Sequence, residues 1–118
     1  MATIQNPTEI RPWGGFQNLF GSEDFLVKLV EVAPGHRLSL QRHFKREEFW
    51  IVISGNGVFE LDGTERAIAP GDMMRVGLTQ THRVSNQESI PLLILELQKG
   101  ECREDDIERL ADDYKRAS

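Results

Sequence analysis

Residues 35–55 have the sequence GHRLSLQRHFKREEFWIVISG, in which two runs alternate between apolar and polar side chains. Such alternation predicts β-strands, because successive side chains of a strand point to opposite faces of a sheet. Gln41 and His43 then share one face of the first strand, and Glu48 opens the second. This stretch therefore predicts a sheet that brings polar side chains together.

Further strand-like segments lie on both sides of this stretch and are separated by turns rich in glycine and proline. The turn at Asp62-Gly63 is a strong hairpin signal. The predicted strands are Phe25–Val32, Arg37–His43, Glu48–Ser54, Val58–Leu61, Arg66–Ala69, Met73–Val76, His82–Asn86 and Leu92–Gln98. Their even spacing predicts an all-β sandwich or barrel rather than alternating strands and helices.

The composition fits one compact domain and narrows the range of partners. With 118 residues and 39% hydrophobic side chains, the chain can bury a single core. We expect an extended arm over residues 1–20, a barrel over about 21–100 and a C-terminal tail over 101–118. The net charge of −5 argues against generic nucleic-acid binding, and no apolar run is long enough to cross a membrane. Cys102 is the single cysteine and no secretory start is present, so we expect a cytoplasmic protein.

The tail has the charge order of a helix. It begins with acidic residues and ends with Lys115 and Arg116, which suits the helix dipole. Ile107, Leu110 and Tyr114 would form one apolar stripe at helical spacing. The sequence therefore predicts a short C-terminal helix packed on the outside of the barrel.

Four polar residues offer ligand atoms that a divalent metal ion accepts: Gln41, His43, Glu48 and His82. If their strands line the inside of a barrel, the four side chains project into one cavity. A carboxylate and imidazoles would be costly in an apolar interior without a partner, and a metal ion supplies one. Taken singly, each residue is more often a hydrogen-bonded core residue or a solvated side chain than a ligand. The joint spacing therefore carries the prediction.

The spacing of these residues resembles that of the cupin superfamily. The first cupin motif reads here as Gly35, Gln41-x-His43, Glu48 and Gly55, and the second as Gly71, His82 and Asn86. Gln41 stands where many cupins have a histidine, and Gly77 and Thr79 replace a proline and a glycine. The resemblance implies a double-stranded β-helix, or jelly-roll barrel, that holds a metal ion on the four residues named above.

Motifs along nearly the whole chain resemble the C-terminal cupin domain of type II mannose-6-phosphate isomerase / mannose-1-phosphate guanylyltransferase. They include Arg11-Pro12-Trp13-Gly14, Arg46-x-Glu48-x-Trp50, Glu96-x-Gln98-x-Gly100 and Glu104-Asp105-Asp106-Ile107. The guanylyltransferase domain itself lies outside this resemblance. Phe44, Lys45 and Phe49 stand where that family commonly has histidines, so part of the imidazole chemistry around the site is missing.

The resemblance implies a metal-dependent sugar-phosphate isomerase that interconverts mannose 6-phosphate and fructose 6-phosphate. A divalent ion, Zn²⁺ in first place and Mn²⁺, Ni²⁺, Fe²⁺ or Co²⁺ as alternatives, would polarise the sugar carbonyl. The missing histidines keep a second hypothesis open, a non-catalytic, metal-containing cupin that binds a sugar or sugar phosphate. Oxidative chemistry at iron is a third hypothesis, which Gln41 and the isomerase-like motifs disfavour.

Cationic residues are the first candidates for contact with a phosphosugar. Arg46 lies between two predicted ligands and matches an arginine of the family motif, and Lys28 shares a strand face that can point into the barrel; both are predicted to be catalytic. Arg11, Arg116 and Ser39 are predicted to bind substrate, since guanidinium groups suit phosphate geometry. We expect no nucleic-acid or membrane partner, and we expect a homodimer, as is common among small cupins.

Overall fold

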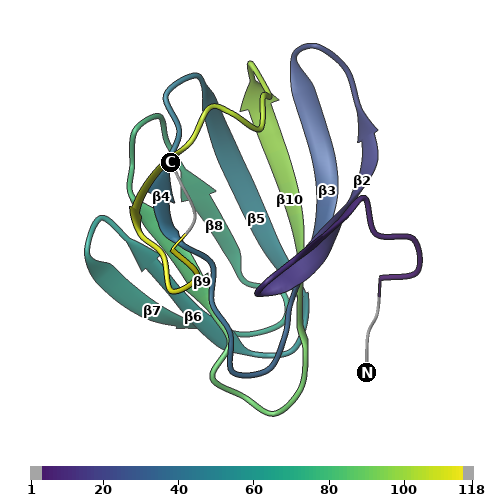
Figure 1. Ribbon diagram of the computed structural model, residues 1–118, viewed down its shortest axis with the longest axis vertical. Coiled ribbons are helices and arrows are strands. Elements are labelled where there is room, and N and C mark those ends of the chain that lie inside the picture. Colours follow the sequence, from purple (N-terminus) through teal and green to yellow (C-terminus); the bar gives the residue numbers. More distant parts are fainter. Residues whose placement is uncertain (1–3, 116–118) are drawn as a thin grey trace.

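Two antiparallel β-sheets face each other and enclose the core of the protein (Figure 1). The computed structural model describes residues 4–115, and every regular element in that range is a β-strand. The all-β class predicted from the sequence is therefore confirmed. Within the same range, no helix is long and apolar enough to cross a membrane.

The strands of the two sheets interleave along the chain. The larger sheet has the spatial order β1 (Glu9–Arg11), β2 (Gly14–Gly21), β3 (Phe25–Val32), β10 (Leu92–Gly100), β5 (Arg46–Ser54) and β8 (Met73–Val76). The smaller sheet has the order β11 (Glu108–Ala111), β4 (Leu40–Arg42), β9 (His82–Ser85), β6 (Gly57–Leu61) and β7 (Thr64–Ile68). β10 pairs with both β3 and β5, although it is the tenth strand of the chain. Residues 9–11 and 14–20 of the predicted arm belong to β1 and β2, at the edge of the larger sheet.

The prediction of a C-terminal helix is wrong, because part of the tail forms a strand that pairs with the edge of the smaller sheet. β11 lies antiparallel to β4, with Arg109 opposite Gln41. The pairing satisfies backbone groups along the edge of β4, and Glu108 accepts a hydrogen bond from Arg42 Nε at 2.5 Å. A short isolated helix is marginal in water, so strand pairing prevails over the favourable charge order of the tail.

Strand alternation gives the interior an apolar part and a polar part. Ile94 on β10 lies opposite Val30 on one side and Val52 on the other, and all three are 2% exposed or less. Glu96 and Gln98 follow Ile94 on the same face of β10 and are also buried. The apolar core therefore gives way to a polar interior along a single strand face.

Replacing Ile94 with alanine tests this account of the core. Because Ile94 is fully buried, its truncation should lower the free energy of unfolding by about 2–5 kcal/mol. Ile53→Ala is the matched control: Ile53 is 47% exposed, and its truncation should cost about 1 kcal/mol or less. Urea denaturation followed by tryptophan fluorescence measures both, and equal losses in the two variants would contradict the assigned core.

Candidate metal centre

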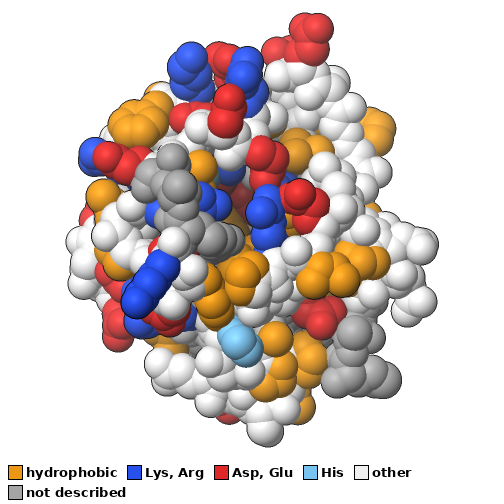
Figure 2. Space-filling view, in the orientation of Figure 1, with side chains coloured by type: hydrophobic (Ala, Val, Ile, Leu, Met, Phe, Trp, Pro, Cys, Tyr) orange, Lys and Arg blue, Asp and Glu red, His pale blue; other side chains and the backbone are white. Residues whose placement is uncertain are grey.

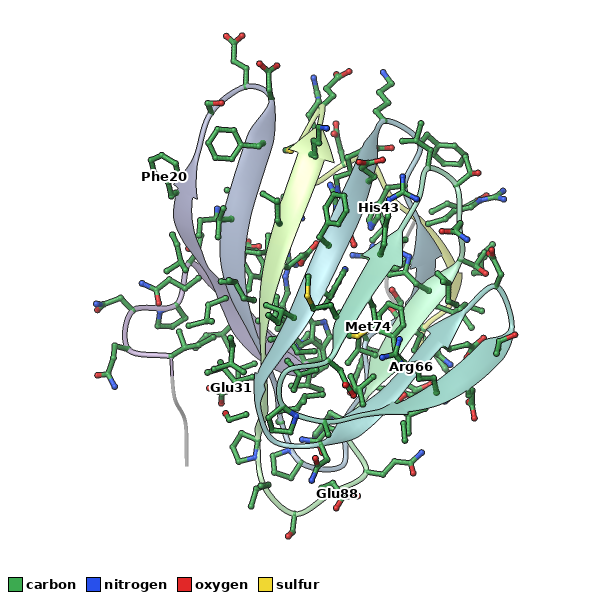
Figure 3. All side chains as sticks on the ribbon, turned by 180° about the vertical axis from the view of Figure 1, so that it is seen from behind. Phe20, Glu31, His43, Arg66, Met74 and Glu88 are labelled. Atoms are coloured by element: carbon green, nitrogen blue, oxygen red, sulfur yellow. The ribbon has the colours of Figure 1, made fainter. Side chains whose placement is uncertain are left out.

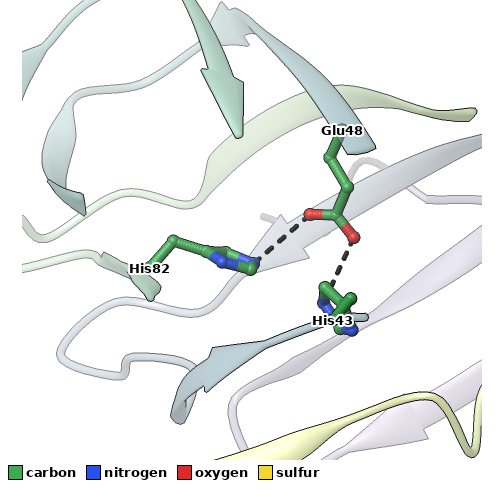
Figure 4. Close-up of side chains that lie close together, drawn as sticks. All are labelled: His43, Glu48 and His82. Carbon is green, nitrogen blue, oxygen red and sulfur yellow. Dashed lines mark ion pairs between the residues drawn. The ribbon is translucent and has the colours of Figure 1, made fainter. Parts of the chain in front are cut away.

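Three ligand side chains converge inside the barrel from different strands. His43 follows β4, Glu48 lies on β5 and His82 opens β9, and their ligand atoms all lie within 4.8 Å of one another. Glu48 lies between the two imidazoles (Figure 4), with Nε2 of His43 at 3.2 Å and Nε2 of His82 at 3.3 Å from its carboxylate oxygens. All three side chains are buried. Two imidazoles and a carboxylate at this spacing can bind one divalent ion.

Backbone carbonyl groups orient both imidazoles. Nδ1 of His43 lies 2.6 Å from the carbonyl oxygen of Asp106, and Nδ1 of His82 lies 3.2 Å from that of Gln80. In the form that binds a metal ion, a proton on Nδ1 would let each ring donate to its carbonyl and leave a lone pair on Nε2, the atom that faces Glu48. Nε2 of His82 is buried and has no hydrogen-bond partner among residues 4–115. A buried lone pair that faces a carboxylate fits a bound metal ion.

Burial and neighbouring charges set the protonation of these ligands. Burial lowers the pKa of His43 to about 4, so this imidazole is neutral near pH 7. Burial by itself would raise the pKa of Glu48, but the two imidazoles and the Arg46 guanidinium outweigh it and hold that pKa well below its usual range. Glu48 is therefore a carboxylate and His43 a neutral imidazole, which are the forms that bind metal ions.

Gln41, the fourth predicted ligand, lies beside this cluster. On β4 it is directly opposite His82 on β9, so the two side chains share one face of the smaller sheet. Gln41 is 9% exposed and lines the same pocket as the three ligands. Coordination through its amide oxygen fits this place and stays a prediction.

All predicted site residues that the structure describes line one pocket between the sheets: Arg11, Lys28, Ser39, Gln41, His43, Arg46, Glu48 and His82. The pocket has a volume of about 610 Å³, including its open mouth. Figure 3 shows His43 toward the end of the barrel opposite Glu88, and Figure 2 shows acidic and basic side chains gathered around a hollow in the surface. Arg116, the remaining predicted residue, lies outside the described part of the chain.

Arg46 connects the metal-ligand cluster to the C-terminal segment. Its Nε donates to Glu48 Oε2 at 3.0 Å, and its Nη1 donates to the carbonyl oxygen of Arg103 at 2.9 Å. Its Nη2 lies 3.3 Å from Nε2 of His43. The guanidinium thus offsets the buried carboxylate and holds residue 103 at the pocket. This geometry fits a positioning role, and the catalytic role expected from the sequence stays a prediction.

Two further cations lie in the outer part of the pocket and share one carboxylate. Lys28 is buried, and its Nζ lies 3.1 Å from Glu104 Oε2. Arg11 is partly exposed, and its Nη2 lies 3.7 Å from the other carboxylate oxygen of Glu104. Ser39, the remaining predicted binding residue, is buried in the pocket wall.

Four polar residues of the pocket were given no role in the site by sequence reasoning: Glu96, Gln98, Glu104 and Arg109. Burial and the neighbouring Glu48 raise the pKa of Glu96 to about 8, so Glu96 is protonated near pH 7. Gln98 Nε2 donates to Glu96 Oε2 at 3.0 Å. The sequence did hold a signal for this pair, because Glu96 and Gln98 alternate with leucines in one strand and must share a face.

The comparison with known proteins agrees with this fold. Residues 2–112 match the family described as mannose-6-phosphate isomerase C-terminal. The chain belongs to this family. A Klebsiella pneumoniae protein described by its double-stranded β-helix domain superimposes with a TM-score of 0.73 at 19% identity, over 88% of this chain and 91% of that chain. The predicted cupin barrel is thereby confirmed.

Curated members related to this mannose-6-phosphate isomerase C-terminal domain are much longer proteins. The alginate biosynthesis protein AlgA of Pseudomonas aeruginosa is 40% identical over 116 residues, which cover 97% of this chain and 24% of AlgA. The mannose-1-phosphate guanylyltransferase of Escherichia coli is 35% identical over 107 residues, which cover 90% of this chain and 22% of that enzyme. This chain therefore spans about a quarter of the length of these relatives.

These relatives correct the function inferred from the sequence. The E. coli relative and a similar Salmonella typhimurium protein are named for guanylyl transfer to mannose 1-phosphate rather than for isomerisation of mannose 6-phosphate. The prediction that this chain is an isomerase interconverting mannose 6-phosphate and fructose 6-phosphate is therefore wrong. The coarser expectation is confirmed, since the family is one of enzymes in carbohydrate metabolism.

Removing either histidine of the cluster should abolish stable metal binding. His43→Ala and His82→Ala each delete one ligand, and we expect at least a tenfold loss of affinity, on the order of that seen when metal sites are perturbed. His36→Ala is the matched control, because His36 contacts the Tyr114 hydroxyl at 2.6 Å and does not line the pocket. Plasma mass spectrometry after loading with Zn²⁺ and dialysis measures the metal content. Full metal content in both cluster variants would contradict the proposed ligands.

The metal-free protein should lose stability on acidification through His43. The pKa of His43 is 6.5 in the unfolded chain and about 4 in the folded protein. Between these two pH values the unfolded state binds more protons than the folded state. The contribution of His43 to the free energy of unfolding is therefore complete above pH 6.5, and it falls by up to about 3 kcal/mol as the pH is lowered toward 4. The free energy of unfolding is measured from pH 4 to 7 for the wild type and for His43→Gln. The difference between the two proteins at each pH gives the contribution of His43. A difference that is constant with pH would contradict the assignment.

Proposed function

We propose that this chain is a metal-containing domain that binds a phosphorylated mannose between its two sheets. The observation that carries the proposal is a single pocket lined both by His43, Glu48 and His82 and by the cations Lys28 and Arg11. A divalent ion at the three ligands can bind and polarise sugar oxygens, and cations can bind a phosphate. A phosphosugar presents both kinds of group in one small molecule.

The relatives support phosphomannose as the ligand class. The family description names mannose 6-phosphate, and the E. coli relative is named for mannose 1-phosphate. Both names share a mannose that carries a phosphate. Because the chain spans only 22% of that E. coli enzyme, the contribution proposed for this barrel is recognition of the ligand rather than the whole reaction of the relative.

Zn²⁺ is the metal that we propose for the centre. Three protein ligands of the nitrogen and oxygen type leave a coordination position for a sugar oxygen or for Gln41, as in zinc sites that bind substrate. Mn²⁺, Ni²⁺, Fe²⁺ and Co²⁺ accept the same donors and are the alternatives to test. The cytoplasmic location and the homodimer expected from the sequence stay predictions.

Calorimetric titration with and without metal tests the proposed function. Zn²⁺-loaded protein should bind mannose 1-phosphate or mannose 6-phosphate, and should bind unphosphorylated mannose at least about tenfold more weakly, since mannose lacks the charge-assisted contacts. Removal of the metal should weaken binding of the same phosphosugar, and so should the substitution Glu48→Gln. Trp13 and Trp50 line the pocket, so their fluorescence gives an independent readout.

Two results would contradict this proposal. The first is equal affinity for mannose and its phosphates. The second is binding of none of these sugars with any of the metals.

A further inference from the structure

Glu104 bridges two cations where the pocket opens to solvent. Its two carboxylate oxygens lie 3.1 Å from Lys28 Nζ and 3.7 Å from Arg11 Nη2. The Lys28 side chain is 6% exposed, whereas that of Glu104 is 54% exposed. An exposed carboxylate therefore supplies the partner of a buried ammonium group, in an arrangement that the oxygens of a phosphate can reproduce.

An aromatic ring holds both cations in place independently of Glu104. Lys28 Nζ lies 4.1 Å from the centre of the Phe16 ring, and Arg11 Cζ lies 5.6 Å from it. Phe16 itself is 5% exposed and is fixed by the core. Because cations are attracted to the face of an aromatic ring, Lys28 and Arg11 keep their places when the carboxylate moves away.

The backbone on both sides of Glu104 is anchored, so its side chain can leave without a movement of the segment. On one side, the carbonyl oxygen of Arg103 accepts a hydrogen bond from Arg46 at 2.9 Å. On the other side, the Asp106 carboxylate accepts hydrogen bonds from the backbone N–H groups of Phe44 and Lys45, each at 3.0 Å. A rotation of the Glu104 side chain is enough to uncover Lys28, while Arg11 keeps its ion pair with Glu9 beside it.

We propose that Lys28 and Arg11 form the anion subsite for the phosphate of a phosphosugar, and that Glu104 occupies this subsite in the ligand-free protein as a built-in competitor. The ligand's phosphate displaces the Glu104 carboxylate. The Glu104 carboxylate is half exposed and becomes fully solvated when it leaves, and the phosphate replaces it as the partner of Lys28. Buried Lys28 needs an anionic partner, and a phosphate dianion satisfies it better than one carboxylate does.

The position of this subsite suits a sugar that also reaches the metal centre. Lys28 on β3 lies opposite Glu96 on β10, and Glu96 lies opposite Trp50 on β5, the strand that carries Glu48. β3 and β5 are therefore two strand spacings apart, or about 10 Å. A phosphorylated hexose extended along the pocket can span such a separation. The sugar part of this inference rests on the proposed function, whereas the anion part does not.

Removing the competitor should strengthen anion binding. Glu104→Gln keeps the size of the side chain but removes its charge. Inorganic phosphate and mannose 6-phosphate should each bind about two- to fivefold more tightly than to the wild type, the range expected for one ion pair. Glu101→Gln is the matched control: Glu101 is 53% exposed in the same segment and pairs with Lys45 instead. Its affinity for both probes should equal that of the wild type. Lys28→Met, which keeps the buried stem, should lose phosphate binding.

The affinity for inorganic phosphate is measured by heteronuclear NMR titration, and that for mannose 6-phosphate by calorimetry on Zn²⁺-loaded protein. The NMR spectrum without ligand verifies that each variant is folded. If the wild type binds mannose 6-phosphate but Glu104→Gln binds it no more tightly, the competitor role is overturned and the proposed function stands. If phosphate binds and is enhanced in Glu104→Gln while no phosphosugar binds, the anion subsite stands and the proposed function fails. Absence of binding of either probe to both proteins overturns both.

Discussion

The buried carboxylate of Glu48 is the constraint on which the rest of the interior depends. It is 1% exposed, and an unpaired charge at such a place would destabilise the fold by about 3–5 kcal/mol. Arg46 Nε and Trp50 Nε1 each donate to it at 3.0 Å, and two imidazoles face the same oxygens. Arg46 in turn bonds to the carbonyl oxygen of Arg103. The need to compensate one carboxylate thus connects β5, the two histidines and the C-terminal segment.

Strand alternation accounts for most of what the sequence could predict. Because side chains alternate between the two faces of a strand, the sequence predicts that Gln41 and Glu48 point inward. The same alternation along β10 places Glu96 on an inward face. It could not predict β11, because the pairing of β11 with β4 depends on an edge that exists only in the folded sheet. Local charge order favoured a helix there, and tertiary contact decided otherwise. Glu104 was missed for the same reason, since it reaches Lys28 across 76 positions of the chain.

The motifs predicted the family and the donor atoms better than the activity. The barrel brings the ligand atoms of His43, Glu48 and His82 within 4.8 Å of one another, a spacing suited to one metal ion. The activity in a relative's name depends on the whole of that relative, of which this chain covers about a quarter. Phe44, beside the ligand His43, is 48% exposed and carries no group that can move a proton. A retained binding centre is therefore compatible with a changed reaction.

The position of β10 has a consequence for the order in which the barrel assembles. β3 ends at Val32, yet its partner β10 begins only at Leu92. β5 pairs with the same strand, β10. The larger sheet cannot close until β10 has been synthesised, and the segment between β3 and β10 must be closed into a loop at an entropic cost before the pairing stabilises it. Long-range pairing of this kind folds slowly. The two halves of the sheet, with their apolar inner faces, stay unjoined during synthesis, and a truncated chain that lacks β10 has no route to a closed interior.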